Sequence, residues 1–330
     1  MAERGAERLR GGIDLGGTKI QTVVVDGRNT VVGEARTPTP TKGGPGDVAA
    51  VMVGALRTAA EAAGVATADL THVGVGSPGQ VNAAAGTVTS ARNLPGWEAS
   101  YALGPELAAQ FGTPIALGND VQVATDAEAQ LGAGRDYSSM LGVFWGTGVG
   151  GGIVLDGRPW LGGGGAGEIG HVVVKLDGAP CPCGRRGCME AYAGRNAMER
   201  RARGLHAKGE ATELFKLAHK RGRERLTSGI WAAALEREDA LAGKLIARAV
   251  EALGAGVASV DNVLDIEVII LGGGLGVRLG QSYADKIAAA MLPHLFNDHR
   301  PPPVVVAELG DLGGAIGASL LTPAVAASAA

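Results

Sequence analysis

The sequence predicts an α/β protein made of two related domains, and three observations support this fold class. At 330 residues, the chain is long enough for two domains of ordinary size. Its hydrophobic fraction is 46%, aromatic residues make up only 4%, and 55 positions are glycine, which favours a core of small aliphatic residues with Gly-rich turns. A Gly-rich strand–turn–strand pattern also occurs twice, as expected for a duplicated domain.

The N-terminal part of the chain combines short apolar runs with two helical periodicities. The apolar runs predict strands at residues 12–15, 20–25, 31–36, 73–75 and 114–117. A longer amphipathic stretch predicts a helix over 48–63. A second helix follows Asp120 and carries Val123, Ala127 and Leu131 on one face.

The C-terminal part adds buried strands and longer helices. Strands are expected at 140–145, 152–155 and 267–271. The stretch 162–194 is expected to be loop-rich, and charged helices to cover 195–238. One long packed helix is predicted by apolar residues at helical spacing, namely Leu241, Leu245, Ala249, Leu253, Val257 and Val260. A last helical stretch covers 311–321.

The repeated pattern aligns without gaps, because Gly12–Arg28 can be laid on Gly142–Arg158 at an offset of 130 residues. Each copy consists of an apolar strand, a Gly-rich turn, a second apolar strand and the tripeptide Asp-Gly-Arg. Chance similarity of two Gly-rich hairpins is the alternative. The equal length and the shared tripeptide favour two related domains that face each other across a cleft.

Charge and targeting signals restrict the partners. The formal net charge of −3 is too near neutral to indicate a nucleic acid or a membrane surface. The charged N-terminal segment lacks the apolar core of a secretory signal, and no apolar run is long enough to span a membrane. We therefore expect a cytoplasmic protein without nucleic-acid or membrane partners. A reducing compartment would keep its three cysteines as thiols.

The first Gly-rich turn lies between Asp14 and Lys19 and has the residues of an anion site. Gly16 and Gly17 let the backbone approach a phosphate closely, Thr18 offers a hydroxyl and Lys19 a positive charge. Asp14 is a candidate ligand for Mg²⁺. An ordinary hairpin turn is the alternative explanation of the same residues.

The second Gly-rich turn, with Gly146, Thr147, Gly148, Gly150 and Gly151, formally contains the pattern GxGxxG. A dinucleotide-binding turn would open a helix, but a strand at 152–155 follows this one, and the chain has no GxxxxGK[ST] motif. We therefore favour two Gly-rich hairpins that hold one nucleotide polyphosphate from opposite sides.

His171, Cys181, Cys183 and Cys188 are spaced H-x9-C-x-C-x4-C. Three thiolates and one imidazole form a complete tetrahedral set for structural Zn²⁺, which leaves no open position for a catalytic water. Prolines and glycines between the cysteines favour a loop tight enough to converge on one ion. Three free buried thiols are the alternative.

Taken in order, the turn DLGGTK, the turn GTGVGGGI, the run Glu168–His171 and the cysteine cluster resemble the ROK family of bacterial sugar kinases and repressors. That family shares the ATPase fold of actin and hexokinase. The resemblance runs from about Gly12 to Ser319 and implies two such ATPase domains with a cleft between them and a zinc-binding loop. We expect a small domain of residues 1–118 with 312–330, and a large domain of 119–311 that carries the zinc loop and a helical insertion.

The pair Asn119-Asp120 follows a predicted strand and opens a predicted helix. An aspartate in this place is very often only a helix cap. However, phosphoryl transfer requires a carboxylate that accepts the proton of the attacking hydroxyl. The resemblance assigns this role to Asp120 and assigns sugar binding to Asn119.

The resemblance also implies further sugar contacts, namely Gly79, Asn93, Glu168, His171 and Glu190. Charged acceptors suit sugar hydroxyls, because charge-assisted hydrogen bonds are the stronger ones. Glu168 and Glu190 could instead be ordinary surface residues. If the zinc loop holds Glu168, His171 and Glu190 in place, metal loss is expected to disturb sugar binding and to leave the ATP turns unchanged.

The function implied by the resemblance is transfer of the γ-phosphoryl group of ATP, with Mg²⁺, to the 6-hydroxyl of a hexose, glucose first. N-acetylmannosamine, N-acetylglucosamine and fructose are alternative substrates, and the sequence does not distinguish ATP from polyphosphate. A sugar-responsive regulator without catalysis is an alternative of another class. Regulators of this family carry a winged-helix domain before the first turn, for which the position of Asp14 leaves no room. We expect a homodimer or a homotetramer.

Overall fold

The computed structural model describes residues 8–91 and 93–323 and confirms the predicted α/β class. The first seven residues and most of the Ala-rich tail lie outside this range. The chain forms two compact units, one of Met1–Leu131, Leu161–Ala166 and Leu309–Ala330, and one of Gly132–Trp160 and Gly167–Glu308. By its contacts, the helix that follows Asn119 belongs to the first unit. The predicted domain boundaries at 118/119 and 311/312 stay a prediction.

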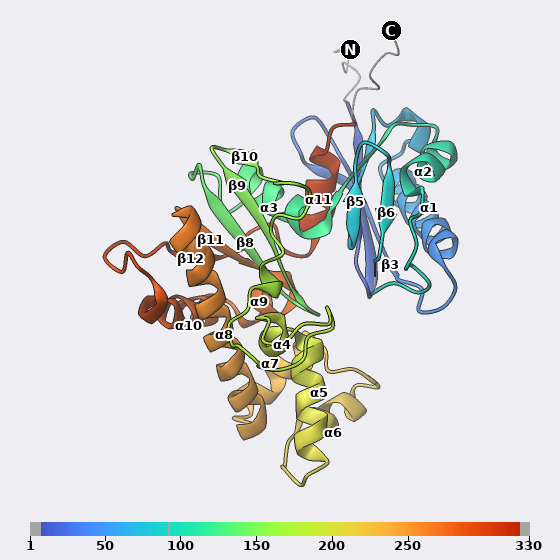
Figure 1. Ribbon diagram of the computed structural model, residues 1–330. Coiled ribbons are helices and arrows are strands. Elements are labelled where there is room, and N and C mark those ends of the chain that lie inside the picture. The colour runs from blue at the N-terminus through green and yellow to red at the C-terminus, as the bar shows by residue number, and fades with distance from the viewer. Residues whose placement is uncertain (1–7, 92, 324–330) are drawn as a thin grey trace. The chain divides into compact units, whose positions relative to one another are not determined.

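The first unit contains a five-stranded sheet in the order β3-β2-β1-β4-β7 (Figure 1). Its strands are β1 (Arg10–Leu15), β2 (Lys19–Val25), β3 (Val31–Pro38), β4 (Val73–Ser77) and β7 (Ile115–Asn119). Strands β1, β2 and β3 pair antiparallel, whereas β4 and β7 continue the sheet parallel to β1. All five strands occur where the sequence predicts them. A small hairpin of β5 (Gln80–Asn82) and β6 (Thr87–Thr89) was not predicted.

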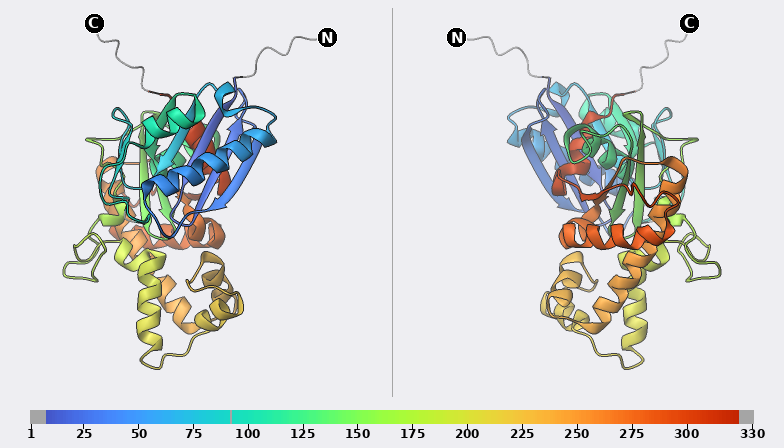
Figure 2. Two further views of the ribbon diagram at one scale, coloured as in Figure 1. Left: turned by 90° about the vertical axis from the view of Figure 1, so that its right-hand side faces the viewer. Right: turned by 90° about the vertical axis from the view of Figure 1, so that its left-hand side faces the viewer.

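Two helices cover opposite faces of this sheet, as strand β2 shows. The unit contains α1 (Pro45–Ala62), α2 (Leu103–Phe111), α3 (Asp120–Leu131) and α11 (Gly313–Leu320). Ile20 and Val24 belong to the core cluster that includes α1, whereas Val23 and Val25 pack with Ala315 of α11. Because successive side chains of a strand point to opposite faces, α1 and α11 lie on different sides. Figure 2 shows α1 running across its face of the sheet.

The second unit repeats this topology in a five-stranded sheet of order β10-β9-β8-β11-β12 (Figure 1). Its strands are β8 (Met140–Trp145), β9 (Val149–Leu155), β10 (Arg158–Pro159), β11 (Val268–Gly272) and β12 (Val304–Val306). Again the first three strands form an antiparallel meander, and β11 and β12 continue parallel to β8. The same strand order supports the two related domains that the repeated hairpin predicts.

The two hairpins are not identical in register, which corrects the gapless alignment. In the first hairpin Leu15 pairs with Ile20, so four residues lie between the paired ends. In the second, Trp145 pairs with Val149 and only three residues lie between them. Strand β9 therefore begins at Val149, three residues earlier than predicted, and the second turn proper is Gly146–Gly148.

Helices make up most of the rest of the second unit. They are α4 (Glu190–Ala193), α5 (Arg195–His206), α6 (Leu214–Lys220), α7 (Ser228–Glu236), α8 (Ala240–Leu264), α9 (Gly273–Leu279) and α10 (Gln281–Met291), besides the 3-10 turn η2 (Ile169–His171). Helix α8 is the long packed helix expected from the apolar spacing. Strand β12 and helices α9 and α10 were not predicted. Within the described residues, no helix is both long and apolar enough to cross a membrane.

Candidate active site

The first unit brings three predicted site residues to one edge of its sheet. Strands β1, β4 and β7 are parallel neighbours, with Asp14 opposite Gly76 and Ser77 opposite Asn119. The carboxyl ends of parallel strands form the usual binding edge of an α/β sheet. Gly76 makes room there, because a Cβ at this residue would lie 3.3 Å from the Cα of Asp120. Asp14, Asn119 and Asp120 therefore belong to one edge.

The first Gly-rich turn lies next to this edge. Its ends are closed by a hydrogen bond from Gly16 N to Lys19 O of 3.0 Å, and Gly17 and Thr18 are exposed. Thr39, just after β3, donates its hydroxyl to Gly16 O at 2.6 Å. Gly17 also lies against Asn93, since a Cβ at Gly17 would be 3.0 Å from Asn93 Nδ2. Asn93, a predicted sugar-binding residue, therefore lies next to the predicted phosphate-binding turn.

Asp14 lies in an unfavourable place for a negative charge. Burial raises the pKa of its carboxyl to about 6, against the opposing effect of Lys19 and with a contribution from Asp311. Asp311 forms an ion pair with Lys19 at 3.3 Å, and a Cβ at Gly314 would come 2.8 Å from Asp14 Cγ. A divalent cation would favour the ionised form of Asp14. Asp311 and Gly314 were not among the predicted site residues.

Helix α3 is capped by Asn119, which resolves the structural alternative for Asp120. Asn119 Oδ1 accepts hydrogen bonds from the amides of Val121 at 3.1 Å and Gln122 at 3.2 Å. This is the geometry of an N-cap residue. Asp120 is the first helical residue, and its Oδ1 accepts from Val121 N at 2.9 Å. The capping role therefore belongs to Asn119.

In the second unit, the four predicted zinc ligands come together. The ligand atoms of His171, Cys181, Cys183 and Cys188 all lie within 4.8 Å of one another. Two separations, Cys183 Sγ to Cys188 Sγ and Cys181 Sγ to His171 Nδ1, are 3.7 Å. Ligands about 2.3 Å from a tetrahedral Zn²⁺ lie about 3.8 Å apart. The cluster thus has the donor set and spacing to hold a zinc ion.

The thiols of the cluster have unequal acidities. Burial raises the pKa of Cys181 to about 12, with neighbouring thiols adding to the effect. Burial also acts on Cys183, but hydrogen bonds from Arg185 outweigh it and lower the pKa of that thiol to about 6. A bound zinc ion would take all three groups as thiolates.

His171 connects this cluster to a carboxylate. Its Nδ1 faces Cys181, whereas its Nε2 lies 3.8 Å from Oε2 of Glu168, whose side chain is 67% exposed. Glu168 therefore has open space around its carboxylate, which a buried structural glutamate would not have. The pair lies at η2, where Gly170 packs directly against the backbone of Val149 in β9.

Glu190 connects the zinc loop to the second Gly-rich turn. It lies two residues after Cys188, and its Oε2 accepts a hydrogen bond from Val149 N at 3.0 Å. Gly148 allows this approach, because a Cβ there would clash with the same oxygen. Glu190 therefore connects the segment next to the zinc ligand Cys188 to the second Gly-rich turn, which the sequence analysis expected metal loss to leave unchanged.

Comparison with known proteins identifies the family of the chain. A model described as the ROK family matches residues 10–325. The chain belongs to the ROK family. A glucokinase of Thermotoga maritima is 30% identical over 312 residues, covering 93% of this chain and 95% of the relative. The N-acetylgalactosamine kinase AgaK of Shewanella sp. (strain ANA-3) is 32% identical over 323 residues, covering 94% and 95%.

A solved structure is also similar over nearly the whole chain. It is a ROK family glucokinase from Streptomyces griseus in complex with glucose and AMPPNP, with a TM-score of 0.81 and 29% identity. The match covers 94% of this ROK protein and 98% of the other chain. The predicted family and fold are confirmed by these matches.

The structure places the predicted residues of this ROK protein in two groups. Asp14, the first turn, Gly79, Asn93, Asn119 and Asp120 belong to the first unit, and the second turn, Glu168, the zinc ligands and Glu190 to the second. Gly79 has a φ of +88° directly before β5, a backbone conformation that favours glycine. Apart from Asp311 and Gly314, the sequence analysis did not single out Arg195, which contacts Thr147 of the second turn, or Ser228, which contacts Arg195.

Proposed function

We propose that this ROK protein is a cytoplasmic ATP-dependent hexose kinase that converts glucose and ATP into glucose 6-phosphate and ADP. The observation that carries the proposal is the edge of the first sheet, where Asp14 and Asn119-Asp120 lie beside the first Gly-rich turn. Relatives of about the same length that are glucokinases and N-acetylhexosamine kinases support the sugar-kinase class.

In this proposal Asp120 is the general base. Its carboxylate would accept the proton of the 6-hydroxyl as that oxygen attacks the γ-phosphorus of ATP. Asn119 uses its Oδ1 as a cap, which leaves its Nδ2 to donate to a sugar oxygen. Further sugar contacts are assigned to Gly79, Asn93, Glu168, His171 and Glu190.

The phosphoryl donor is assigned to the two Gly-rich turns. The residues are Asp14, Gly16, Gly17, Thr18 and Lys19 in the first turn, and Gly146, Thr147, Gly148, Gly150 and Gly151 in the second hairpin. Asp14 would hold the Mg²⁺ that accompanies ATP and neutralises phosphate charge. The cluster of His171, Cys181, Cys183 and Cys188 would hold a structural zinc ion that fixes the loop.

The alternative functions within the sugar-kinase class differ in the hexose that is phosphorylated. N-acetylmannosamine, N-acetylglucosamine and fructose are the other candidates, and the Shewanella relative adds N-acetylgalactosamine. An N-acetyl group needs space and a hydrogen-bond partner that glucose does not require. The ratio of kcat/KM values for glucose and the N-acetyl sugars therefore decides between them.

The test is a coupled assay of ADP release by purified protein with ATP, Mg²⁺ and a panel of these sugars. We expect Mg²⁺-dependent turnover with glucose above all others. Turnover with an N-acetylhexosamine instead would change the substrate and keep the kinase class. If folded, zinc-loaded protein binds a sugar but none of the panel stimulates ADP release, the kinase proposal is wrong.

A further inference from the structure

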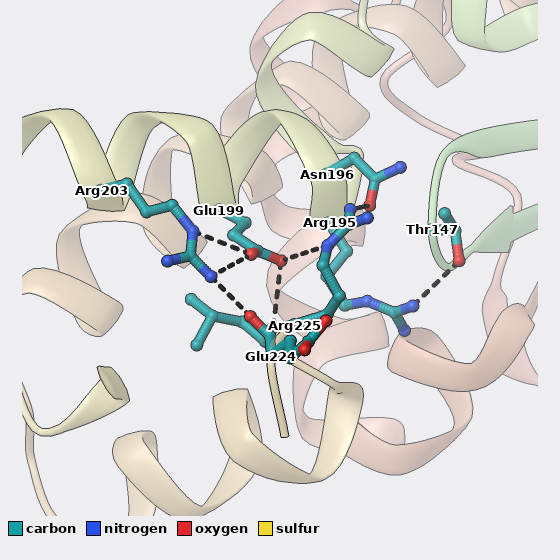
Figure 3. A network of polar contacts seen from close by, with 8 residues as sticks. Thr147, Arg195, Asn196, Glu199, Arg203, Glu224 and Arg225 are labelled. Carbon is teal, nitrogen blue, oxygen red and sulfur yellow. Dashed lines mark hydrogen bonds and ion pairs between the residues drawn. The ribbon is translucent and has the colours of Figure 1, made fainter. Parts of the chain in front are cut away.

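The helical stretch 195–238 carries none of the family motifs, yet its first residue contacts the second Gly-rich turn. Arg195 N donates to Gly146 O at 3.1 Å, and Arg195 Nη2 donates to Thr147 Oγ1 at 2.9 Å. Asn196 N adds a bond to Thr147 O at 3.1 Å. Figure 3 shows the guanidinium of Arg195 directed at Thr147. The start of α5 therefore holds both the backbone and the hydroxyl of this turn.

The guanidinium of Arg195 bonds only to neutral groups. Besides Thr147, it contacts Ser228 at the start of α7, with 2.9 Å from Nη1 to Oγ. Among the described residues no carboxylate lies within ion-pair distance of Arg195. Glu199, on the same helix, is already bonded to Arg203 at 2.7 Å and Arg225 at 3.3 Å (Figure 3). Arg195 is thus a partly buried cation without a carboxylate partner.

These contacts fix the polarity of the Thr147 hydroxyl. A guanidinium can only donate hydrogen bonds, so Thr147 Oγ1 must be the acceptor in this pair. The hydroxyl hydrogen of Thr147 is then left to donate to a different acceptor. A donating hydroxyl in a Gly-rich turn, with the guanidinium of Arg195 behind it, suits an anionic oxygen rather than a cation or an apolar group.

Ser228 links Arg195 to the glycine run that follows strand β11. Its Oγ also accepts from Arg195, and it lies 3.6 Å from the position of a Cβ at Gly274, in the glycine run after β11. A Cβ at Gly146 would lie 3.8 Å from Gly274 N. One arginine therefore connects the second turn to the glycine-rich end of the neighbouring strand, all within the second unit.

We propose that Arg195 is a positioning residue for the phosphoryl donor, which orients the Thr147 hydroxyl toward the polyphosphate chain of a nucleoside triphosphate. This inference rests on the proposed function, because it assigns the second turn to that donor. It also gives the helical stretch 195–238 a role, since α5 carries the arginine and α7 supplies Ser228, which accepts a hydrogen bond from it.

The test is calorimetric binding of Mg²⁺·ATP to the wild-type protein and to Arg195→Ala and Thr147→Val, without any sugar present. Loss of a charge-assisted hydrogen bond should weaken ATP binding about tenfold in Arg195→Ala. Arg195→Lys should recover only part of this loss, because an ammonium cannot make both bonds of the planar fork. The double variant should bind ATP little worse than Thr147→Val alone, since Arg195 acts through that hydroxyl.

Arg203→Ala is the matched control, because Arg203 is an arginine of the same helix that pairs with Glu199 and does not contact the turn. It should leave ATP binding within twofold of the wild-type value. Kinetics with the preferred sugar should show a raised KM for ATP and an unchanged KM for the sugar in Arg195→Ala. An equal loss of affinity in Arg203→Ala, or strictly additive effects of Arg195→Ala and Thr147→Val, would overturn the inference.

The failure of this inference and of the proposed function are separable. If the wild-type protein binds Mg²⁺·ATP but phosphorylates no hexose, the kinase proposal fails and the Arg195 comparison is still measured. If Arg195→Ala binds ATP as the wild-type protein does, the inference fails and the kinase proposal stands. A wild-type protein that binds neither ATP nor tripolyphosphate would contradict both.

Discussion

The first and second Gly-rich hairpins have the same place in their sheets but are held by different chemistry. In the first unit, the turn lies between Asp14 and Lys19, and the lysine is paired with Asp311. In the second unit, Glu190 binds the backbone after the turn and Arg195 binds its hydroxyl. Neither hairpin uses the residue types of the other.

The residues that differ come from segments outside the repeated hairpins. Asp311 lies near the C-terminal end of the chain, Glu190 follows the zinc loop and Arg195 begins the helical stretch. The duplicated sheet therefore supplies two similar backbones, and the unrepeated segments supply the charges. In the proposed function, the acid groups and the metal ion are accordingly assigned to the first turn.

The largest expected effect concerns a difference between the two units at the carboxyl ends of their parallel strands. Strand β7 is followed by Asp120, the proposed base, whereas its counterpart β12 is followed by Ala307, which has no carboxylate. Asp120→Asn should lower kcat by roughly 10²–10⁴-fold, about 3–5 kcal/mol of barrier. The Tm should stay close to that of the wild type, because Asn119 carries the cap.

Asp126→Asn is the control for Asp120→Asn, since Asp126 is a partly buried carboxyl on the same helix and bonds to Gln122. Its kcat should remain within about twofold of the wild-type value. If Asp120→Asn keeps more than about a tenth of wild-type turnover, Asp120 is not the general base.

The second expected effect concerns the loss of folding stability that ionisation of the buried Asp14 carboxyl causes. Its pKa is raised from 3.8 to about 6 by burial, so the folded protein binds more protons than the unfolded chain between these pH values. Stability should therefore fall as pH rises from about 4 to 6, and stay lower above. Asp14→Asn cannot ionise and should raise the free energy of unfolding at pH 7 by up to about 3 kcal/mol, while ATP turnover falls.

Urea unfolding at pH 4.5 and pH 7 measures this effect. The difference between Asp14→Asn and the wild type should be larger at pH 7. Asp136→Asn is the control, because Asp136 is exposed and should change stability little at either pH. Equal stability of Asp14→Asn and the wild type at pH 7 would show that ionised Asp14 carries no such cost.

The sequence was sufficient for most of the fold and for the grouping of the four candidate zinc ligands. The strands of the first sheet and helix α8 follow from apolar periodicity, and the zinc ligands from their spacing. Periodicity did not reveal β12, because three valines between prolines and polar residues give too short a signal. Apolar periodicity also could not locate the start of β9, since Gly150 and Gly151 are compatible with either a turn or a strand.

The contacts that hold the turns could not be predicted, because they join residues far apart in the sequence. Arg195 and Thr147 are 48 residues apart, and Glu190 and Val149 are 41 apart. Arg195 follows a glycine and Glu190 begins a short helix, and neither local pattern predicts the distant residue to which the side chain bonds. The Asn119 cap was local, but the pair Asn119-Asp120 offered two residues of equal capping ability.

The third expected effect tests whether the zinc loop supports the binding of both the sugar and ATP through Glu190. Cys183→Ser should lower bound zinc from about one ion per chain and should weaken sugar binding about tenfold. Because Glu190 contacts the second turn, the KM for ATP should also rise, by a smaller factor. Metal analysis and kinetics measure both.

Arg186→Ala is the control for the loop, since Arg186 is exposed and is not a ligand. It should retain zinc and both KM values. Active wild-type protein without stoichiometric zinc would contradict the zinc assignment. An unchanged KM for ATP in zinc-depleted protein would instead contradict the link through Glu190.

The smallest expected effect comes from the same substitution in each turn, Gly17→Ala and Gly148→Ala. Neither glycine has a positive φ, so alanine is tolerated by the backbone and only the neighbours matter. The new Cβ at residue 17 would meet Asn93 Nδ2 at 3.0 Å and Asn93 O at 3.3 Å, which a shift of this exposed residue by a few tenths of an ångström relieves. The new Cβ at residue 148 would clash with Glu190 Oε2, which also holds Val149 N.

Gly148→Ala should therefore cost part of one charge-assisted hydrogen bond, about 1 kcal/mol, or roughly a fivefold rise in the KM for ATP. Gly17→Ala should change that KM less than about twofold. Because Glu190 is also assigned to the sugar, Gly148→Ala should raise the KM for the sugar as well, which Gly17→Ala should not do. If the two variants behaved alike, the turns would be held equally loosely, and Glu190 would not be the group that fixes the second one.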